Sequence, residues 1–413
     1  MSVTNRLARV NPVYFTAKTA VSLMAQAGIP DADKIVRALA LENNAPLQNM
    51  PDAETILGNA IVVEAKYRTM CRLIEGAGGK TLVDLPCGYT PKAIHMTEHG
   101  RTFVGLDLPI VVQEVEPIIR KLVGQSENIS FHGVDATNFN SLQTALRDVG
   151  GPLCITTEGM MMYFSDDEAE TVVVNIQRLL REHGGCWITP DPEFALQFSG
   201  TFQAVFGEES LAKLMATKNT AQGQSAVAAL GNSFIIEPSD IPASQARAES
   251  LLARYGLKAE KVNLGGNMPE LSVYKQLTTE QIVRFKEAMR QCHYWLITID
   301  ETKRLRDTER FMEESPFALE YAAKKGILHL SLCGRLDTIS APQLLLVWEK
   351  VNNGGSIAGV IIDCTQLQYI SSAGIRLLRA MQESCSCRID FSGANAKVKE
   401  ILQQNGFWMM DET

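Results

Sequence analysis

The sequence predicts an α/β protein with a doubly wound, mainly parallel sheet and a second, smaller α/β domain. Between residues 81 and 264, short apolar segments rich in β-branched residues alternate with longer segments of helical character, which is the pattern of successive β-α-β units. Several of the short segments end in an acidic residue. The alternation resumes after Ser315-Pro316, where a charged run ends, so we expect a domain boundary there.

The composition of the 413-residue chain is that of a globular protein of about two or three domains. Hydrophobic residues make up 46% and charged residues 21%, which permits large cores and disfavours disorder. The net charge is −8 and no basic stripe is present, so nucleic acid is not an expected partner. The nine cysteines are scattered without metal-ligand spacing, which indicates reduced thiols and no metal site.

The N-terminal region predicts helices and carries no targeting signal. Residues 1–15 lack an apolar signal core, and no run in the chain reaches membrane-spanning length, so a cytoplasmic protein with no membrane partner is expected. Helical patterns cover residues 12–45 and 61–75, and the second carries Lys66, Arg68 and Arg72. A solvated helix face is the simplest interpretation of these three bases, and we adopt it for Arg72.

The chain is organised around a β-α-β unit between residues 81 and 109. A strand over 82–85 runs into a turn containing Pro86 and Gly88, and a second strand over 102–106 ends at Asp107. A glycine after the first strand lets the backbone approach a ligand, and a carboxylate after the second can bind an adenosine ribose. Pro86 occupies the first glycine position, which argues against a pyrophosphate cradle. S-adenosylmethionine fits better, and the alternative is an ordinary crossover with no ligand.

Two further strands end in acidic residues that would share this edge of the sheet. The strand over 129–135 ends in Asp135, which could accept a hydrogen bond from an adenine amino group, or could instead cap a helix over 138–149. The strand over 152–157 is followed by Glu158. Because ligands of such sheets bind at the carboxyl ends of the strands, Glu158 could take the cationic amino group of an amino-acid-like ligand.

Soft apolar and aromatic residues follow Glu158. Met160, Met161 and Met162 could wall a site for a sulfonium and its methyl group, or could simply be core residues. Further along, four phenylalanines recur at i+4 spacing and make one helix face aromatic: Phe194, Phe198, Phe202 and Phe206. Such a face is either a lid over a substrate or part of the core, and we favour the core.

The remaining elements complete both domains. In the first domain we expect a helix over 166–180, a strand over 186–189, a last strand over 271–274, and then a connector made of a helix over 279–298 and a charged run over 300–314. In the second domain we expect strands over 327–338, 360–364 and 388–393, and helices over 342–352, 371–384 and 396–404. Two serines, Ser371 and Ser372, stand at the start of one of these helices, where capping is the simplest role.

Residues 1–276 resemble the leucine carboxyl methyltransferase-like group of class I, Rossmann-like S-adenosylmethionine-dependent methyltransferases. The resemblance rests on VDLPCGYTPKA, GLDLP and TEGMMMYFSDDEAE. It implies that Gly88 faces the methionine moiety, Asp107 binds the ribose, and Glu158 binds the methionine amino group. The sequence departs from the group's pattern at Pro86, which replaces a glycine, and at residues 90–92, where Thr-Pro-Lys replaces Asp-Thr-Arg.

The resemblance also implies roles for four other residues. Asp135 and Ala136 would contact the adenine. Lys18 and Arg68 fall where the group places bases for the cofactor carboxylate.

Residues 317–413 resemble the STAS domains of anti-sigma factor antagonists and anion-transporter tails. The resemblance rests on LCGRLDT, IIDCTQLQYISSAGIRLL and FSGANAKVKEIL, which span nearly the whole domain. Ser372 aligns with the serine that partner kinases phosphorylate in that family. Ser371 replaces the aspartate that usually precedes this serine.

The sequence therefore predicts a methyltransferase domain over 1–276, a helical connector over 277–316 and a STAS domain over 317–413. The expected activity is an O-methyl transfer from S-adenosylmethionine to a carboxylate or hydroxyl of a small molecule or peptide. The STAS domain would serve regulation or assembly, through a protein partner or self-association. The alternative is a degenerate, non-catalytic methyltransferase fold that acts as an interaction platform for the STAS domain.

Overall fold

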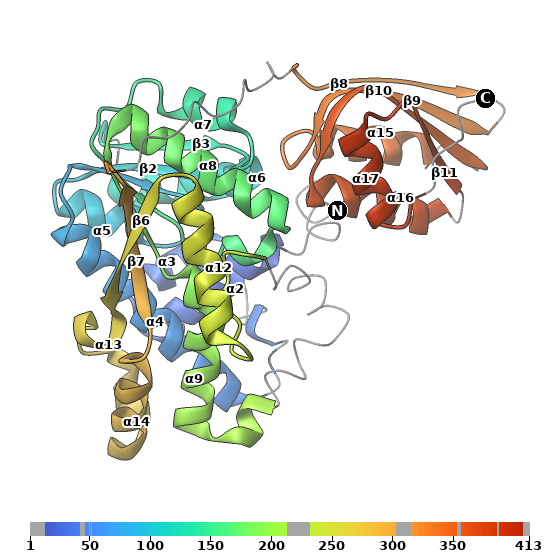
Figure 1. Ribbon diagram of the computed structural model, residues 1–413. Coiled ribbons are helices and arrows are strands. Elements are labelled where there is room, and N and C mark those ends of the chain that lie inside the picture. Colours follow the sequence, from blue (N-terminus) through green and yellow to red (C-terminus); the bar gives the residue numbers. More distant parts are fainter. Residues whose placement is uncertain are drawn as a thin grey trace. The chain divides into compact units, whose positions relative to one another are not determined.

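The computed structural model describes residues 13–41, 46–48, 50, 52–124, 126–212, 232–302, 315–324, 326–352, 357–385 and 388–407. The chain divides into a larger compact unit within residues 12–306 and a smaller one that includes residues 307–413 (Figure 1). The predicted N-terminal segment before residue 13 and most of the predicted charged run lie outside the described residues. Among the described helices, none combines the length and the apolar character needed to cross a lipid bilayer.

The larger unit is built on a seven-stranded sheet with the order β3-β2-β1-β4-β5-β7-β6. Strands β1 to β5 are parallel, and β7 runs antiparallel to both of its neighbours. The strands are β1 (Thr81–Asp84), β2 (Thr102–Asp107), β3 (Ile129–Gly133), β4 (Leu153–Thr156), β5 (Gly185–Thr189), β6 (Leu257–Asn263) and β7 (His293–Ile299). The structure confirms the predicted doubly wound, Rossmann-like α/β class.

Helices cover the sheet and connect its strands. Those before β3 are α2 (Val13–Gln26), α3 (Ala32–Ala38), α4 (Ala53–Gly76), α5 (Lys92–Glu98) and α6 (Pro109–Val123). Those after β3 are α7 (Phe139–Leu146), α8 (Asp166–His183), α9 (Phe194–Phe206), α12 (Ile241–Arg254), α13 (Leu264–Asn267) and α14 (Thr279–Met289). Side chains cap the N-termini of several of these helices. Asp52 accepts a hydrogen bond from Thr55 N at the start of α4, and Ser165 and Glu168 form a capping box at the start of α8.

The end of the larger unit differs from the sequence prediction. Residues Ser272–Gln276 form a 3₁₀ turn rather than a last strand, and β7 (His293–Ile299) lies where the second half of a connector helix was expected. The β7 sequence, HYWLITI, is aromatic and β-branched, which favours a strand. Burial of Tyr294 and Trp295 holds it in the sheet. The boundary predicted at residue 276 is therefore too early, because β7 belongs to the larger sheet.

The aromatic face of α9 packs into the core of the larger unit, as the sequence favoured. Phe198 and Phe202 are buried and contact Val62 of α4, while Phe194 and Phe206 are partly buried against the same cluster. Packing between α4 and α9 is close, since a Cβ at Gly58 would lie 2.5 Å from the Phe202 ring.

The smaller unit has a four-stranded sheet with the order β11-β10-β9-β8. Its strands are β8 (Ala318–Lys324), β9 (Ile327–Leu336), β10 (Gly359–Ile370) and β11 (Arg388–Ser392), and only the β8 pairing is antiparallel. Its helices are α15 (Ala341–Asn352), α16 (Ser372–Cys385) and α17 (Ala396–Gln404), which lie on one face of the sheet (Figure 1). Alternate residues of β9 are buried under them, so this unit has a core of its own.

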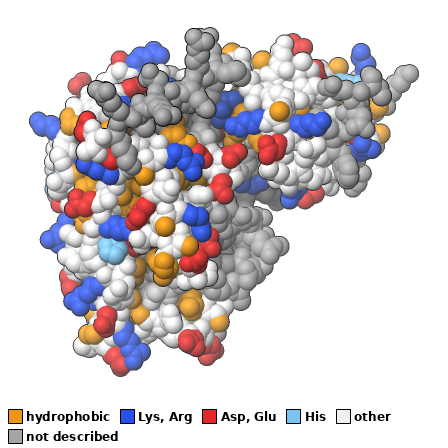
Figure 2. Space-filling model, viewed as in Figure 1, with side chains coloured by type: hydrophobic (Ala, Val, Ile, Leu, Met, Phe, Trp, Pro, Cys, Tyr) orange, Lys and Arg blue, Asp and Glu red, His pale blue; other side chains and the backbone are white. Residues whose placement is uncertain are grey.

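Charges and cysteines follow the sequence expectations with one exception. On the face drawn in Figure 2, basic and acidic side chains are interspersed over the described surface. Seven described cysteines are free thiols: Cys71, Cys87, Cys154, Cys186, Cys292, Cys333 and Cys364. Cys385 is disulfide-bonded, so the expectation of reduced thiols is wrong at this position.

Candidate functional site

The parallel strands β2, β1 and β4 bring the predicted site residues to one edge of the sheet. Asp84, the last residue of β1, is level with Gly105 of β2 and Thr156 of β4. The segments that carry Gly88, Asp107 and Glu158 therefore leave the sheet at the same, carboxyl, edge. This is the edge at which open α/β sheets bind their ligands.

Asp107 and Gly88 are joined by a direct hydrogen bond. Gly88 N donates to Asp107 Oδ2 over 2.7 Å, and Leu108 N donates to Oδ1 over 2.7 Å. Burial raises the pKa of Asp107 to about 7, although the two backbone donors oppose this shift. Gly88 has a φ of 53°, and a Cβ placed on it would meet only the Thr90 side chain, at 3.9 Å. The backbone at Gly88 is thus open to the approach of a ligand.

A buried ion pair lies beneath this loop. Lys92 Nζ donates to Asp84 Oδ1 over 2.7 Å, and Thr156 Oγ1 donates to the same oxygen over 2.6 Å. Burial alone would lower the pKa of Lys92, but the Asp84 carboxylate raises it, so the lysine stays charged. Asp84 Oδ2 is buried without a hydrogen-bond partner. The pair ties α5 to the end of β1 and thereby fixes the loop between them.

Asp135 and Ala136 form a tight turn after β3. Asp135 Oδ1 accepts hydrogen bonds from Thr137 N over 2.8 Å and from Thr137 Oγ1 over 2.6 Å. The Ala136 carbonyl accepts from Asn175 Nδ2 over 2.9 Å. The start of α7 is capped by Asn138, so the alternative that Asp135 caps this helix is wrong.

Glu158 lies beside Lys66, which is one of three basic residues on a helix predicted from the sequence. Lys66 of α4 is buried rather than solvated, and its Nζ lies 3.6 Å from Glu158 Oε1. The same Nζ lies 4.9 Å from the centre of the Phe194 ring and 5.8 Å from that of Phe198. Glu158 itself is partly open, with 18% of its side chain exposed.

The two bases predicted for a cofactor carboxylate are bonded elsewhere. Lys18 Nζ lies 2.9 Å from Glu114 Oε2, which also accepts a hydrogen bond from Tyr89. Arg68 Nε pairs with Glu64 over 2.6 Å, and its Nη2 donates to Ser272 Oγ over 2.9 Å. Both cations thus tie secondary structure elements together.

Asp191 organises the turn after Glu158, and the sequence pattern did not predict this role. Asp191 is fully buried after β5, and its carboxylate accepts hydrogen bonds from Gly159 N (2.6 Å), Met160 N (3.0 Å) and Met161 N (3.0 Å). These three donors belong to the turn that follows Glu158. Asp191 therefore sets the direction in which the chain leaves β4, and the signal for it is only an acid one residue after a proline that follows a strand.

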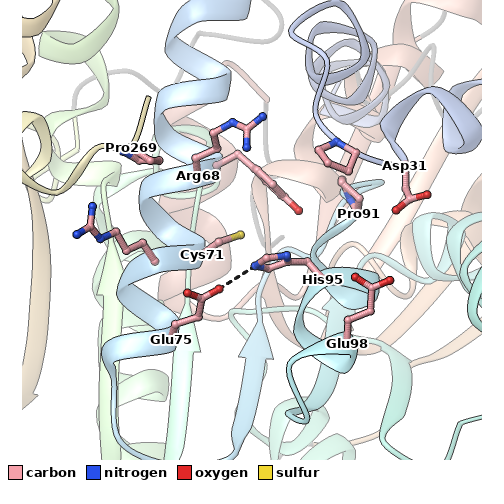
Figure 3. A pocket seen from close by; sticks show the side chains of 11 residues that line it. Asp31, Arg68, Cys71, Glu75, Pro91, His95, Glu98 and Pro269 are labelled. Carbon is pink, nitrogen blue, oxygen red and sulfur yellow. Dashed lines mark hydrogen bonds and ion pairs between the residues drawn. The ribbon is translucent and has the colours of Figure 1, made fainter. Parts of the chain in front are cut away.

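A pocket of about 470 Å³ lies between α4 and α5 (Figure 3). Arg68, Cys71 and Glu75 line it from α4, and His95 faces Glu75 across it at 2.9 Å. Burial raises the pKa of the Cys71 thiol to about 12, so this thiol is not a nucleophile at neutral pH. The lining does not include Gly88, Asp107 or Glu158.

The same place holds a group of potential metal ligands. Glu75, His95 and His99 bring one ligand atom each within 4.8 Å of one another. Glu75 and His95 are already paired, and His99 Nδ1 is bonded to the His95 carbonyl. These hydrogen bonds already account for the positions of the three side chains, so we assign no metal to them.

In the smaller unit, Ser372 is the first residue of α16 and is half-buried. The preceding Ser371 is buried, and its Oγ accepts a hydrogen bond from Gly374 N over 3.4 Å. Ser371 therefore fills the capping position, which leaves Ser372 in the first turn of the helix.

A comparison with protein-family models matches a segment of the smaller unit. Residues 320–408 match the family model described as "Mlab, STAS domain", so the smaller unit contains a STAS domain. Among solved structures, an anti-sigma factor antagonist from Mycobacterium paratuberculosis is similar at 17% identity over 24% of this chain and 87% of its own, with a TM-score of 0.21. A comparison with curated protein sequences found no match.

Other similar solved structures include methyltransferases. An O-methyltransferase family protein from Burkholderia thailandensis is 15% identical over 67% of this chain and 69% of its own, with a TM-score of 0.33. Human N-acetylserotonin methyltransferase, solved in complex with SAM, is 12% identical over 67% and 69%, with a TM-score of 0.31. At this level of similarity these matches do not assign an activity.

Proposed function

We propose that the chain is an S-adenosylmethionine-dependent O-methyltransferase of the leucine carboxyl methyltransferase-like group, joined to a STAS domain that regulates or assembles it. The acceptor would be a carboxylate or hydroxyl of a small molecule or peptide, and the compartment the cytoplasm. The observation that carries the proposal is the carboxyl edge of the larger sheet. There an open glycine backbone and a buried carboxylate stand in direct contact, with a second carboxylate on the neighbouring strand end.

The residues present at this edge fit the proposed cofactor. Each oxygen of Asp107 accepts one backbone N–H and keeps a further lone pair, so the carboxylate can still accept from two ribose hydroxyls. The space in front of Gly88 is free of side chains except Thr90. Glu158 is partly exposed and can receive an ammonium group. Pro86 removes only one backbone N–H, and a ligand without phosphates does not require it.

The chain's own contribution to methyl transfer would be orientation and exclusion of water. S-adenosylmethionine, when bound, supplies a methyl group on a sulfonium that an in-line nucleophile can displace. Met160, Met161 and Met162 are buried in the hydrophobic core of the larger unit, so they support the turn after Glu158 and do not wall the site. A carboxylate acceptor is already anionic and needs no general base, so positioning alone can contribute about 7 kcal/mol or more to lowering the barrier.

Calorimetric titration with S-adenosylmethionine and S-adenosylhomocysteine tests the proposal. We expect micromolar binding, about −8 kcal/mol, that is lost in Asp107→Ala. Asp148→Ala, at an exposed position, is the matched control and should bind as the wild type does. Absence of heat with either ligand would contradict the enzyme and favour the alternative, a non-catalytic platform for the STAS domain. Binding retained by Asp107→Ala would contradict the assigned pocket.

The role of the STAS domain has a separate test at Ser372. A phosphate or carboxylate here would lie at the N-terminal end of α16, where the helix dipole favours negative charge. We expect Ser372→Asp to change the mass of the protein in solution or its methyl-transfer rate, and Ser372→Ala to behave as the unmodified chain. If neither quantity differs between the two variants, Ser372 is not a switch.

A further inference from the structure

Two free cysteines lie side by side in the larger sheet, on neighbouring parallel strands. Cys154 of β4 is directly opposite Cys186 of β5. No other cysteines face each other in the strands that the structure describes. Neighbouring strands lie roughly 4.8 Å apart, and a disulfide joins residues whose Cα atoms are about 4.4–6.8 Å apart. The backbone therefore already holds the two cysteines at disulfide spacing.

Both cysteine side chains point to the same face of the sheet. Leu153, Ile155 and Trp187 belong to the hydrophobic core on one face of β4 and β5. Because side chains alternate along a strand, Cys154 and Cys186 share the opposite face. The two thiols form a hydrogen bond with each other. A disulfide between them thus requires rotation of side chains rather than movement of strands.

The two strands approach each other closely beside this pair of thiols. Gly185 precedes Cys186, and a Cβ placed on Gly185 would lie 1.9 Å from the Leu153 carbonyl oxygen. The φ of Gly185 is 105°, in the region that favours glycine. Leu153 N also donates to the Gly184 carbonyl over 3.1 Å. These contacts fix the register of β4 and β5 at the position of the two thiols.

The two thiols differ in exposure and in acidity. Cys154 is fully buried, whereas Cys186 is partly exposed and follows the exposed residues Gly184 and Gly185. The hydrogen bond with Cys154 lowers the pKa of the Cys186 thiol, although burial opposes this shift. The same hydrogen bond, and then burial, raises the pKa of Cys154. An accessible, more acidic thiol beside a second thiol is typical of redox-sensing cysteines, in which the first reacts and the second resolves.

We propose that Cys154 and Cys186 are a redox modification site, at which a peroxide converts the two thiols to a reversible disulfide. The Cys186 sulfur attacks one peroxide oxygen, the O–O bond breaks, and the leaving hydroxide takes up the thiol proton to give water. The Cys154 sulfur then attacks the sulfur of the Cys186 sulfenic acid. The S–O bond breaks, and the leaving oxygen takes the Cys154 proton to give a second water. The two thiols together lose two electrons, which the peroxide gains, and a dithiol reductant reverses the change.

This site is separate from the proposed cofactor site. Cys154 and Cys186 are each the second residue of their strand, whereas Asp107 and Glu158 lie where the chain leaves the sheet at its carboxyl edge. The inference therefore does not depend on the proposed function. Affinity for S-adenosylhomocysteine decides the proposed function, and the state of the two thiols decides this inference.

Treatment of the folded chain with hydrogen peroxide, after reduction with dithiothreitol and its removal, tests the proposal. The remaining thiols are alkylated in denaturant, and the peptides are identified by mass spectrometry without reduction. We expect a cross-linked pair of peptides that contains Cys154 and Cys186 and lacks two hydrogen atoms relative to the separate peptides. Alkylation of both cysteines should fall at least about tenfold, and renewed dithiothreitol should restore it.

Three variants assign the role of each thiol. In Cys186→Ser, the buried Cys154 should stay open to alkylation after unfolding, because no thiol beside it reacts with peroxide first. In Cys154→Ala, oxidation of Cys186 should stop at the sulfenic acid, which dimedone labels. Cys333→Ser removes another partly exposed thiol and is the matched control, so it should form the same cross-link as the wild type.

The wild-type experiment decides the inference by itself if a variant does not fold. Full alkylation of Cys154 and Cys186 after peroxide treatment would overturn it. A sulfenic acid that stays on Cys186 in the wild type, or a cross-link that forms only when peroxide is added in denaturant, would overturn it as well.

Discussion

Asp107 has the most informative chemistry of any single residue at the carboxyl edge. Its place at the end of the second strand of a β-α-β unit predicted a ribose-binding role, and the structure adds a short bond to Gly88 and deep burial. Burial raises its pKa from 3.8 to about 7. The group therefore changes charge near neutral pH, where an ordinary aspartate would be fully ionised.

This pKa predicts a pH-dependent affinity. Only the ionised carboxylate offers all its lone pairs to ribose hydroxyls, so affinity for S-adenosylhomocysteine should rise with pH through about 7 and then level off. The folded state also retains this proton more tightly than the unfolded state does, so the contribution of Asp107 to the free energy of unfolding falls as pH rises from about 4 to 7. Calorimetric and urea titrations at several pH values measure both trends. In Asp107→Asn both should be absent, and a pH-dependent step that persists there belongs to another group.

Asp191 should be the most costly acid to remove from the larger unit. Asp191→Ala would leave three backbone N–H groups of the turn after Glu158 without their acceptor. We expect the free energy of unfolding to fall by about 3 kcal/mol or more, as measured by urea denaturation, with Asp148→Ala as the exposed control. A loss below about 1 kcal/mol would show that the carboxylate does not hold the turn.

Single residues were predictable where their role follows from the position in a strand. Asp107 and Glu158 stand at strand ends, and that position is visible in the sequence. Lys66 and Asp191 were not predictable, because their partners lie far along the chain: Lys66 meets Glu158, and Asp191 meets Gly159. Local pattern carries no information about such contacts.

At the scale of elements, the packing of α4 against α9 depends on one glycine. Glycine inside a helix normally destabilises it relative to alanine by about 0.5–1 kcal/mol. At Gly58, however, a Cβ would lie 2.5 Å from the Phe202 ring, so overpacking should outweigh the gain in helix propensity.

Gly58→Ala should therefore lower the free energy of unfolding by about 1–3 kcal/mol, measured by urea denaturation. Phe202→Leu in the same chain should recover part of the loss, because the smaller side chain frees the space. Gly76→Ala, at the end of the same helix with no atom within 4 Å of the added Cβ, is the matched control and should be neutral or slightly stabilising. Equal effects at both glycines would contradict the close packing.

Elements were predictable where the period of the hydrophobic pattern was clear. The strands from residue 81 to 189 and the aromatic face of α9 were found in this way. The segment His293–Ile299 was assigned to a helix because it continues an amphipathic pattern from residue 279. Its partners in the sheet are β5, more than 100 residues earlier, and β6, between 30 and 42 residues earlier. Pairing with these strands decides its conformation.

At the scale of the whole molecule, two units with separate cores share one chain. All predicted cofactor residues, from Lys18 to Glu158, lie in the larger unit, while the STAS match covers residues 320–408. The two-part organisation was predictable from the two sets of motifs.

Removal of the STAS domain should leave the cofactor site intact. A chain ending after Thr302 keeps β7 and every residue at the carboxyl edge, so its affinity for S-adenosylhomocysteine should equal that of the full chain within about twofold. Calorimetry measures this directly, and a chain ending at residue 276, which lacks β7, should fail to fold. A large loss of affinity on removal of residues 303–413 would show that the STAS domain contributes to the site.

The most direct test of the account is a crystal structure of the chain grown with S-adenosylhomocysteine. We predict the ribose hydroxyls on Asp107, the thioether beside Gly88, and the amino group of the ligand on Glu158. A ligand bound instead in the pocket of about 470 Å³ between α4 and α5 would contradict the assignment of the carboxyl edge as the site.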